Sequence, residues 1–503
     1  MTDPSTTAAP PRERRTPGLF VAALPVVLML ALMITGTVWL GLDPVVLLVA
    51  ACVVAGAIAL WIGVTWDEML AGMRSKIDAA MPALLILISI GMLIGTWTLS
   101  GTIPMIVDWG LKAIQPSWIV VLAFLITMVV STVTGTSWGA VGTVGVALIG
   151  VAGGLGVSLP MTAGAIISGA YFGDKMSPMS DTTNLAPAVA GSTLFEHIRH
   201  LLYTTGPAAV LAGVLYLVLG RTQHADGQAA QRTEALRDVL EQGFHFNLLL
   251  LLPPAVVLLG AVMKKPPLPT IIASSAVAGA LGGIFQGFSL QQICSAAATG
   301  FTSSMLSGHG GIDLQHLPEA AQTLLDRGGM SSMATTMLIG LAGFAFAGIL
   351  TVTGCLDVLM HRLLGKVRRT GGIILATALS SVATALAMGV SYLAIIVPGQ
   401  AFRDVYPERG LAPKNLSRTL EDSGTVFVPL VPWTEAATYM SATLGVATMA
   451  YAPYAFLNYF GVIIAVICGY TGFGIARQEP VRRSAEEPVP FAAQAEEPVV
   501  VRG

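Results

Sequence analysis

Apolar runs of 18 or more residues recur along the whole chain, and no other feature limits its fold so strongly. A helix needs a run of about that length to cross the hydrocarbon core of a bilayer. Only 11% of the residues are charged, against about 25% in soluble globular proteins. Because lipid offers no water to backbone polar groups, helices are the expected spanning elements. The sequence therefore predicts an all-α polytopic membrane protein.

The runs divide into two sets of seven predicted crossings, of which about 11–14 are expected to be transmembrane helices. The fifth element of each set is short and could instead be a re-entrant segment. The first set is Leu19–Leu42, Pro44–Val64, Met81–Ser100, Ser117–Thr136, Trp138–Gly150, Met161–Ser192 and Ile198–Leu219. The second set is Phe246–Met263, Pro267–Gln286, Ser332–Thr353, Gly371–Met388, Val390–Arg403, Asn415–Gly445 and Tyr451–Phe473.

The polar stretch Gly173–Asn184 interrupts the sixth crossing with three charges, on Asp174, Lys175 and Asp181. A charge at the centre of a membrane helix costs about 2.5–3.5 kcal/mol, so charges kept there usually have a function. An ordinary surface loop is one interpretation. The flanking apolar pieces, however, are too short to span separately at ~20 residues each. The stretch also holds Gly and Pro, which free backbone carbonyls, so a broken helix at the bilayer midplane is the second interpretation.

Collinear matches predict that the chain is a duplication. Val54-Ala55-Gly56-Ala57 recurs as Val277-Ala278-Gly279-Ala280, and the pair Gly173 and Pro178 recurs as Gly424 and Pro429. The equivalent of the first polar stretch is Leu420–Glu435, which is also charged and also contains Gly and Pro. A third polar segment, Ser131–Gly139, packs five hydroxyls into seven residues. Carbonyls, carboxylates and hydroxyls at such breaks are the ligands that a dehydrated alkali cation requires.

Charge placement predicts that the two halves are inverted relative to each other. Lys264 and Lys265 follow the first crossing of half two, where half one has only Asp43. Arg403 and Arg409 likewise occupy a loop whose first-half partner has no charge. The positive-inside rule then places matching loops on opposite faces and both termini in the cytoplasm. The expected organisation is a disordered tail 1–18, a first repeat 19–219, a polar external linker 220–245, a second repeat 246–474 and a disordered tail 475–503.

The segment Gly173–Ala186 resembles the signature of the NhaC-type Na+/H+ antiporter family, in the ion-transporter superfamily. Ser417–Thr425 and the following Pro429–Trp433 resemble its second-half counterpart. The resemblance implies a multi-pass protein of the cell (inner or plasma) membrane that needs no cofactor and transports Na+ and H+. The family also includes exchangers of small carboxylates such as malate and lactate. Glu435 departs from the small neutral residues that the family usually has there.

We interpret the chain as a Na+/H+ antiporter in which Na+ and H+ compete for one carboxylate while one bundle rocks against the other. Asp181 is the expected shared carboxylate and sodium ligand, and Asp174 is the second. The remaining ion-binding candidates are oxygen ligands: Ser177, Thr182, Thr183, Asn184, Thr136 and Ser137. The coupling candidates lie in half two: Glu421, Asp422, Arg418, Thr425, Thr434 and Glu435. Arg418 is expected to pair with Asp422 at i, i+4, and Lys175 is either a tethered counter-charge or a snorkelling surface residue.

The main alternative is an exchanger of small carboxylates coupled to Na+ or H+. A channel, a membrane-embedded enzyme and a scaffold are the other classes considered. The sequence shows no phosphate loop, zinc-ligand spacing or nucleophile elbow, so we do not expect an enzyme. A net charge of −2 predicts no nucleic-acid partner, and the expected partners are the lipid bilayer and the transported ions. A homodimer is left open.

Overall fold

The computed structural model describes residues 17–223, 229–307, 314–355, 358 and 369–478. Its regular elements are helices, and the pairing of extended backbone within these ranges is limited to two isolated β-bridges. The all-α prediction is therefore confirmed. The two predicted tails, 1–18 and 475–503, fall almost entirely outside the described residues, as do 308–313 in the longer loop of half two.

The elements of the first half run from the N-terminal helix to the helix that precedes the linker. They are α1 (Leu19–Ile34), α2 (Pro44–Ile62), α3 (Trp66–Leu99), α4 (Thr102–Ala113), α5 (Pro116–Thr134), α6 (Ser137–Ala140), α7 (Val146–Gly154), α8 (Leu159–Met176), α9 (Asp181–Ala190) and α10 (Leu194–Arg221). A five-residue π-helix at Val141–Gly145 joins α6 to α7, so Ser137–Gly154 forms one candidate span.

The linker and the second half contain the remaining elements. They are α11 (Ala229–Gly243), α12 (Leu252–Val262), α13 (Pro267–Gln286), α14 (Leu290–Thr299), α15 (Glu319–Leu325), α16 (Ala334–Val352), α18 (Thr370–Met388), α19 (Ser391–Phe402), α20 (Val405–Glu408), α21 (Pro413–Leu420), α22 (Glu435–Leu444), α23 (Thr448–Tyr451) and α24 (Phe456–Thr471). The region predicted as a polar linker thus contains a 15-residue helix, α11.

Nine helices of the described residues are long and apolar enough to cross a membrane, and two bent pairs raise the number to eleven. Eleven is the lower end of the predicted range. The difference arises because several predicted crossings are broken or short. The predicted crossing Met161–Ser192 is divided between α8 and α9, and Asn415–Gly445 is divided among α21, a π-helix at Glu421–Thr425, a 3-10 helix at Val428–Leu430 and α22. Both predicted crossings are therefore interrupted, as expected, and the position of the breaks at the bilayer midplane stays a prediction.

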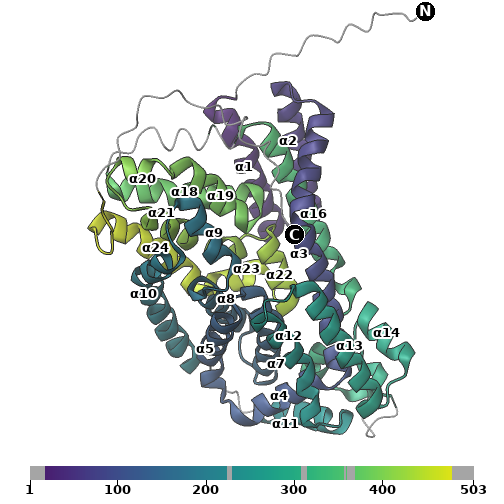
Figure 1. The fold of residues 1–503 in the computed structure, drawn as a ribbon. Helices are drawn as coiled ribbons and strands as arrows, with labels where there is room; N and C mark the ends of the chain where they lie inside the picture. The colour runs from purple at the N-terminus through teal and green to yellow at the C-terminus, as the bar shows by residue number, and fades with distance from the viewer. Residues whose placement is uncertain (1–16, 224–228, 308–313, 356–357, 359–368, 479–503) are drawn as a thin grey trace, which may run out of the picture.

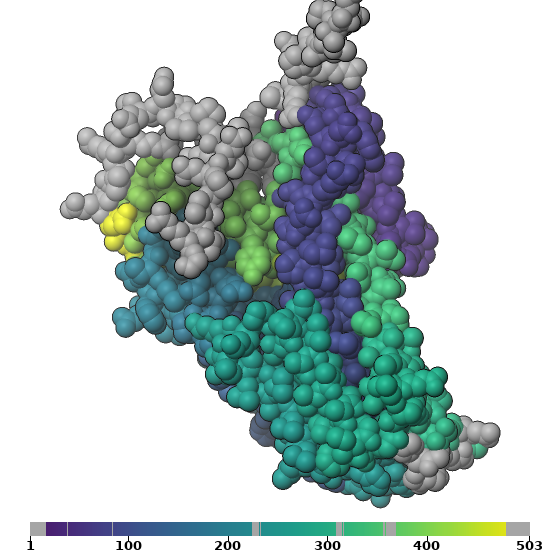
Figure 2. Space-filling model, turned by 45° about the vertical axis from the view of Figure 1, so that its right-hand side comes forward, coloured from purple at the N-terminus to yellow at the C-terminus, as the bar shows by residue number. Residues whose placement is uncertain are grey.

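The helices form two adjoining groups (Figure 1). One group is a column in which the 34-residue helix α3, which begins with a capping box at Thr65 and Glu68, packs against α16, α16 packs against α2, and α2 packs against α1. Figure 2 shows the teal segment that contains α12–α14 lying against this purple column. The other group contains α5, α8, α10, α18 and α24. Each group includes helices from both halves of the sequence, so the halves are interleaved.

Glycines allow two pairs of segments to pack backbone against backbone. On α8, a Cβ at Gly173 would lie 2.4 Å from the amide nitrogen of Thr132, and one at Gly169 would lie 2.2 Å from the carbonyl oxygen of Phe124, both on α5. On α3, Gly91 and Gly95 leave room for Gly329, whose amide donates to the Gly91 carbonyl at 2.6 Å. Side chains at these positions would force the elements apart.

Similar turns occur at positions that the predicted duplication matches. Left-handed glycines end matching helices in the two halves: Gly135 after α5 and Gly389 after α18, and Gly191 after α9 and Gly445 after α22. The φ angles are 70° and 65° for the first pair and 80° and 69° for the second. Only glycine adopts such angles readily. These turns fit the predicted duplication, and both the duplication and the opposite orientation of the halves stay predictions.

An ion-pair ring fixes α11 to α4. The buried carboxylate of Asp108 accepts hydrogen bonds from Lys112 at 2.7 Å and from Arg237 at 3.1 Å. Glu241 contacts the same two cations, at 2.8 and 3.0 Å, and closes the ring. Below the ring, Leu236 and Leu240 of α11 are fully buried. The linker helix is thus packed firmly onto half one.

Candidate ion-binding site

Both broken helices resume at a carboxylate. After α8 ends at Met176, the chain turns through Pro178, and α9 restarts at Asp181 with the Ser180 hydroxyl accepting the Thr183 amide. In half two, α22 begins at Glu435, and the preceding residue, Thr434, caps it. A helix N-terminus favours a negative side chain, which explains why an acid is tolerated at each first position.

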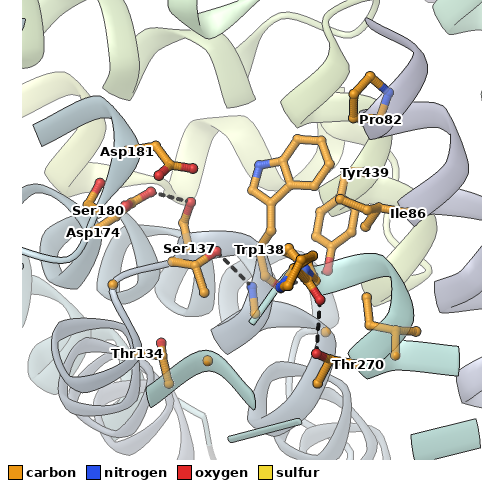
Figure 3. A pocket seen from close by; sticks show the side chains of 18 of the residues that line it. Pro82, Ile86, Thr134, Ser137, Trp138, Asp174, Ser180, Asp181, Thr270 and Tyr439 are labelled. Atoms are coloured by element: carbon orange, nitrogen blue, oxygen red, sulfur yellow. Dashed lines mark hydrogen bonds between the residues drawn. The ribbon is translucent and has the colours of Figure 1, made fainter. Parts of the chain in front are cut away.

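The breaks border a cavity of about 550 Å³. Seven of the predicted site residues line it: Thr136, Ser137, Asp174, Asp181, Thr182, Thr425 and Glu435. Figure 3 shows Asp174 and Asp181 on one side of the cavity and the rings of Trp138 and Tyr439 across from them. Those rings stack with their centroids 4.3 Å apart. The cavity combines carboxylates and hydroxyls from both halves of the chain.

The two acids of half one differ in how they meet the cavity. Asp174 is 8% exposed, and its Oδ2 accepts a hydrogen bond of 2.6 Å from the Ser137 hydroxyl, so it is held in place. Asp181 is exposed to the cavity, and the Tyr392 hydroxyl of α19 lies 3.4 Å from its Oδ2. Asp181 is therefore the more accessible carboxylate, and Asp174 the more rigid one.

Three predicted oxygen ligands, Ser177, Thr183 and Asn184, bind backbone groups at the break and do not line the cavity. The Thr183 hydroxyl donates to the carbonyls of Asp174 and Lys175 at the end of α8. The Asn184 amide donates to the carbonyls of Pro178 and Ser180, and the Ser177 hydroxyl accepts the Met179 amide. In half two, the Thr434 hydroxyl similarly donates to the Val428 carbonyl. These side chains satisfy backbone groups that the breaks leave free.

Behind the cavity lies a buried group of charged residues, which we call the inner polar cluster: Lys175, Arg418, Glu421 and Asp422. The Lys175 ammonium donates to Asp422 Oδ1 at 2.5 Å, and both side chains are at most 1% exposed. Lys175 is thus a tethered counter-charge and not a surface residue. The Thr182 hydroxyl, which lines the cavity, donates to Glu421 Oε1 at 3.1 Å. Thr182 therefore connects the cavity to the cluster.

The expected pairing of Arg418 with Asp422 is wrong. Arg418 donates through Nη1 to the Gly474 carbonyl at 2.7 Å, and Lys175 occupies the carboxylate instead. The i, i+4 spacing does not bring the two side chains together because Glu421–Thr425 form a π-helix, which rotates Asp422 away from its position on a regular α-helix. Within the described residues, Arg418 Nε and Nη2, Glu421 Oε2 and Asp422 Oδ2 have no hydrogen-bond partner.

Several residues that line the cavity were not among the predicted site residues. Tyr171 lies on α8, Ser391 and Tyr392 begin α19, and Lys264 and Lys265 stand at the exposed end of α12. The repeat could have indicated the α19 pair, because Ser391 and Tyr392 follow Gly389 as Ser137 and Trp138 follow Gly135. No group of three His, Cys, Asp or Glu side chains in the described part of the chain is arranged to hold one metal ion.

A multi-pass helical bundle with two broken helices and a carboxylate-lined cavity at the breaks defines a secondary transporter. The sequence profile of the Na+/H+ antiporter family matches residues 169–473. The chain belongs to the Na+/H+ antiporter family, and the resemblance to its NhaC branch is confirmed by relatives that span nearly its whole length.

The relatives differ in the cargo that their names record. An uncharacterized Na+/H+ antiporter of Haemophilus influenzae is 44% identical over 92% of this chain and 98% of its own. The NhaC Na+/H+ antiporter of Alkalihalophilus pseudofirmus is 35% identical over 90% and 95%. An arginine/ornithine antiporter of Halobacterium salinarum is 35% identical over 96% and 97%, and a malate-2H+/Na+-lactate antiporter of Bacillus subtilis is 32% identical over 92% and 96%.

Proposed function

We propose that this protein exchanges Na+ for H+ across the cell membrane, with Asp181 as the carboxylate for which the two ions compete. The observation that carries the proposal is the position of Asp181, which is exposed in the cavity at the first residue of a half-helix. Asp174 lies beside it and adds a second negative charge. Two neighbouring carboxylates in a partly desolvated cavity favour a bound cation.

Ser137, Thr136 and Thr182 supply further oxygen atoms to this site. Oxygen ligands of this kind suit hard cations, to which Na+ belongs. Coupling to half two runs through Thr182 to Glu421, and from there to Asp422, which Lys175 holds. Occupation of the cavity by either ion would allow one helix group to rock against the other and expose the site to the opposite face.

The proposal includes a location and a topology. The protein lies in the plasma (inner) membrane with both termini cytoplasmic and the linker outside, following the distribution of Lys and Arg. We propose a homodimer as the assembly of the protein. We propose no cofactor for this exchange, in which Na+ and H+ are the cargo.

The test is ion flux in everted vesicles or proteoliposomes. Asp181→Asn is expected to abolish Na+-dependent proton release at wild-type expression, because the amide cannot exchange a proton for a cation. Asp108→Asn is the control, since Asp108 lies in the ion-pair ring of α4 and not in the cavity. Normal Na+-dependent proton release by the Asp181 variant would refute the assignment.

A second candidate function is the exchange of small carboxylates. Two observations favour it: the cavity volume of about 550 Å³ exceeds what a single dehydrated cation fills, and Lys264 and Lys265 stand at its edge. Against it stand three acidic side chains, Asp174, Asp181 and Glu435, within the same cavity. Counterflow of labelled malate or lactate that does not depend on Na+ would favour this candidate over Na+/H+ exchange.

A further inference from the structure

Tyr439 connects the second-half helix α22 to the turn of half one that carries Ser137. Tyr439 is 1% exposed and lies four residues after Glu435, so the two side chains share one face of α22, and both line the cavity. The Tyr439 hydroxyl donates to the Trp138 carbonyl of α6 at 2.7 Å. A side chain of half two thus binds the main chain of half one beside the proposed Na+ site.

The ring of Tyr439 makes a second contact with the same residue. It stacks on the indole ring of Trp138, with the ring planes 17° apart and the centroids 4.3 Å apart (Figure 3). Stacked aromatic pairs stabilise each other beyond the area that they bury. The hydrogen bond and the stacked rings together fix Trp138 against α22.

A glycine makes this close approach possible. Gly142 lies one turn after Trp138, and a Cβ there would lie 2.6 Å from the Tyr439 hydroxyl oxygen. Gly142 belongs to the π-helix that follows α6, and the Trp138 carbonyl also accepts the Val141 amide. Because a carbonyl oxygen has two lone pairs, it can accept the tyrosine hydroxyl as well. The local sequence therefore leaves room for a hydroxyl from the other half of the chain.

The contact lies next to a sodium ligand of the proposed function. Ser137 directly precedes Trp138, and its hydroxyl donates to Asp174 at 2.6 Å. Ser137 also begins the candidate span that runs to Gly154. The first turn of a helix lacks part of its main-chain hydrogen bonds, so contacts from outside decide where it lies. A shift of α22 would move Trp138, and with it the serine that orients Asp174.

We propose that Tyr439 is a positioning residue for Na+ binding: it holds α6 so that the Ser137 hydroxyl stays on Asp174. Its action is indirect and passes through Trp138 and Ser137. The position of α22 then sets the affinity of the site in half one for Na+. The proposal rests on Na+/H+ exchange as the proposed function.

The test is the Na+ dependence of initial proton flux in proteoliposomes that contain the purified full-length protein. Tyr439→Phe keeps the ring and removes the hydroxyl. Its KM for Na+ should rise about three- to tenfold, the factor that one neutral hydrogen bond supplies, while its maximal rate changes by less than about twofold.

Tyr216→Phe is the matched control for a lost tyrosine hydroxyl. Tyr216 is also fully buried, its hydroxyl lies 2.6 Å from the Tyr454 carbonyl oxygen, and it does not line the cavity. The control should keep the wild-type KM for Na+, even where the lost hydrogen bond lowers the thermal midpoint. A change of KM without a change of maximal rate therefore separates positioning from a general loss of stability.

Gly142→Ala tests the same contact from the other side. Its methyl group would lie 2.6 Å from the Tyr439 hydroxyl oxygen and 2.9 Å from the end of the flexible Ile90 side chain. The hydroxyl is displaced, so KM should rise as in Tyr439→Phe. In the double variant the methyl group meets no hydroxyl, and KM should match that of Tyr439→Phe alone. Gly142→Ala also decides the outcome if Tyr439→Phe fails to fold.

A double-mutant cycle tests whether Tyr439 acts through Ser137. Ser137→Ala should raise KM on its own, and adding Tyr439→Phe should raise it no further, because the hydroxyl to be positioned is already gone. Independent effects, in which the two increases multiply, would show that Tyr439 does not act through Ser137.

Four results would overturn the proposal: a wild-type KM in Tyr439→Phe or, if that variant does not fold, in Gly142→Ala; a fall of the maximal rate alone; an equal KM shift in Tyr216→Phe; or independent effects in the cycle. The proposed function fails in a different way. Wild-type liposomes without Na+-driven proton flux would remove both proposals, whereas wild-type flux with an unchanged KM in Tyr439→Phe removes only this one.

Discussion

Removing the ammonium of Lys175 should destabilise the protein far more than removing an exposed lysine. The Nζ–Oδ1 distance to Asp422 is 2.5 Å and both side chains are buried. At an effective dielectric constant of about 20, charges at that distance attract by roughly 7 kcal/mol. Desolvation of both groups offsets most of this attraction, so the pair contributes little net stability. Lys175→Met removes the attraction but leaves Asp422 buried, and the expected cost is about 3–5 kcal/mol.

The measurement is the thermal midpoint of the purified protein in detergent, followed by size-exclusion chromatography after heating. Lys175→Met should lower the midpoint by ~5 °C or more. Lys414→Met is the matched control, because the Lys414–Glu196 pair is 3.8 Å long and both partners are at least 31% exposed. An exposed pair of this kind contributes about 0–1 kcal/mol, so the control should stay near the wild type.

A double variant, Lys175→Met with Asp422→Leu, completes the experiment. Replacing a buried ion pair by apolar side chains is often neutral or stabilising, so the midpoint should recover. Transport should not recover, since the coupling group is gone. The reasoning is refuted if Lys175→Met melts with the wild type, or if the double variant is less stable than Lys175→Met alone.

Three further predictions concern single positions. Ser137→Ala removes a 2.6 Å hydrogen bond to the buried carboxylate of Asp174, worth about 1.5–3 kcal/mol. It should reduce Na+-dependent proton flux about tenfold or more, whereas Ser137→Thr should retain most of the flux. Equal fluxes in the two variants would contradict the role of the hydroxyl. Gly173→Ala places a methyl group 2.4 Å from the backbone of α5 and should lower the thermal midpoint by the equivalent of about 1–3 kcal/mol. The control is Gly206→Ala in α10, where the new methyl group meets no atom within 4 Å, so this variant should be neutral or stabilising. Asp108→Asn leaves Lys112 and Arg237 with a neutral, weaker hydrogen-bond acceptor and should cost about 1–3 kcal/mol of stability. The Na+ dependence of proton flux should not change. A shifted Na+ dependence would contradict a purely structural role of the ion-pair ring.

The helical class and the two broken helices could be predicted from the sequence. Long apolar runs indicate helices in a bilayer, and polar residues with Gly and Pro inside such runs indicate where the helices break. It was insufficient for lengths such as that of α3, which begins at Trp66 and not at Met81. The added turns carry Asp67, Glu68 and Arg74, and a helix that continues past its apolar run has no hydropathic signal. Span boundaries set by capping are thus harder to predict than spans themselves.

The candidate site was predictable as a segment but not side chain by side chain. Thr182 and Thr183 are neighbours of the same type, yet one lines the cavity and the other binds the end of α8. Nothing in the sequence separates a hydroxyl that faces a cavity from one that satisfies a free carbonyl. The Lys175–Asp422 pair joins residues 247 positions apart, a contact that only the packed helices reveal.

The backbone contact between α5 and α8 has a mechanical consequence. Where Gly169 and Gly173 bring two main chains together, no flexible side chains lie between them that could absorb a sliding motion. The two helices should therefore behave as one stiff lever. Bending is then confined to the short stretch from Ser177 to Ser180, where α8 has ended and α9 has not yet begun. Asp174 lies on α8, and Asp181 follows the flexible stretch Ser177–Ser180 at the start of α9. Bending at this stretch therefore changes the distance between the two carboxylates.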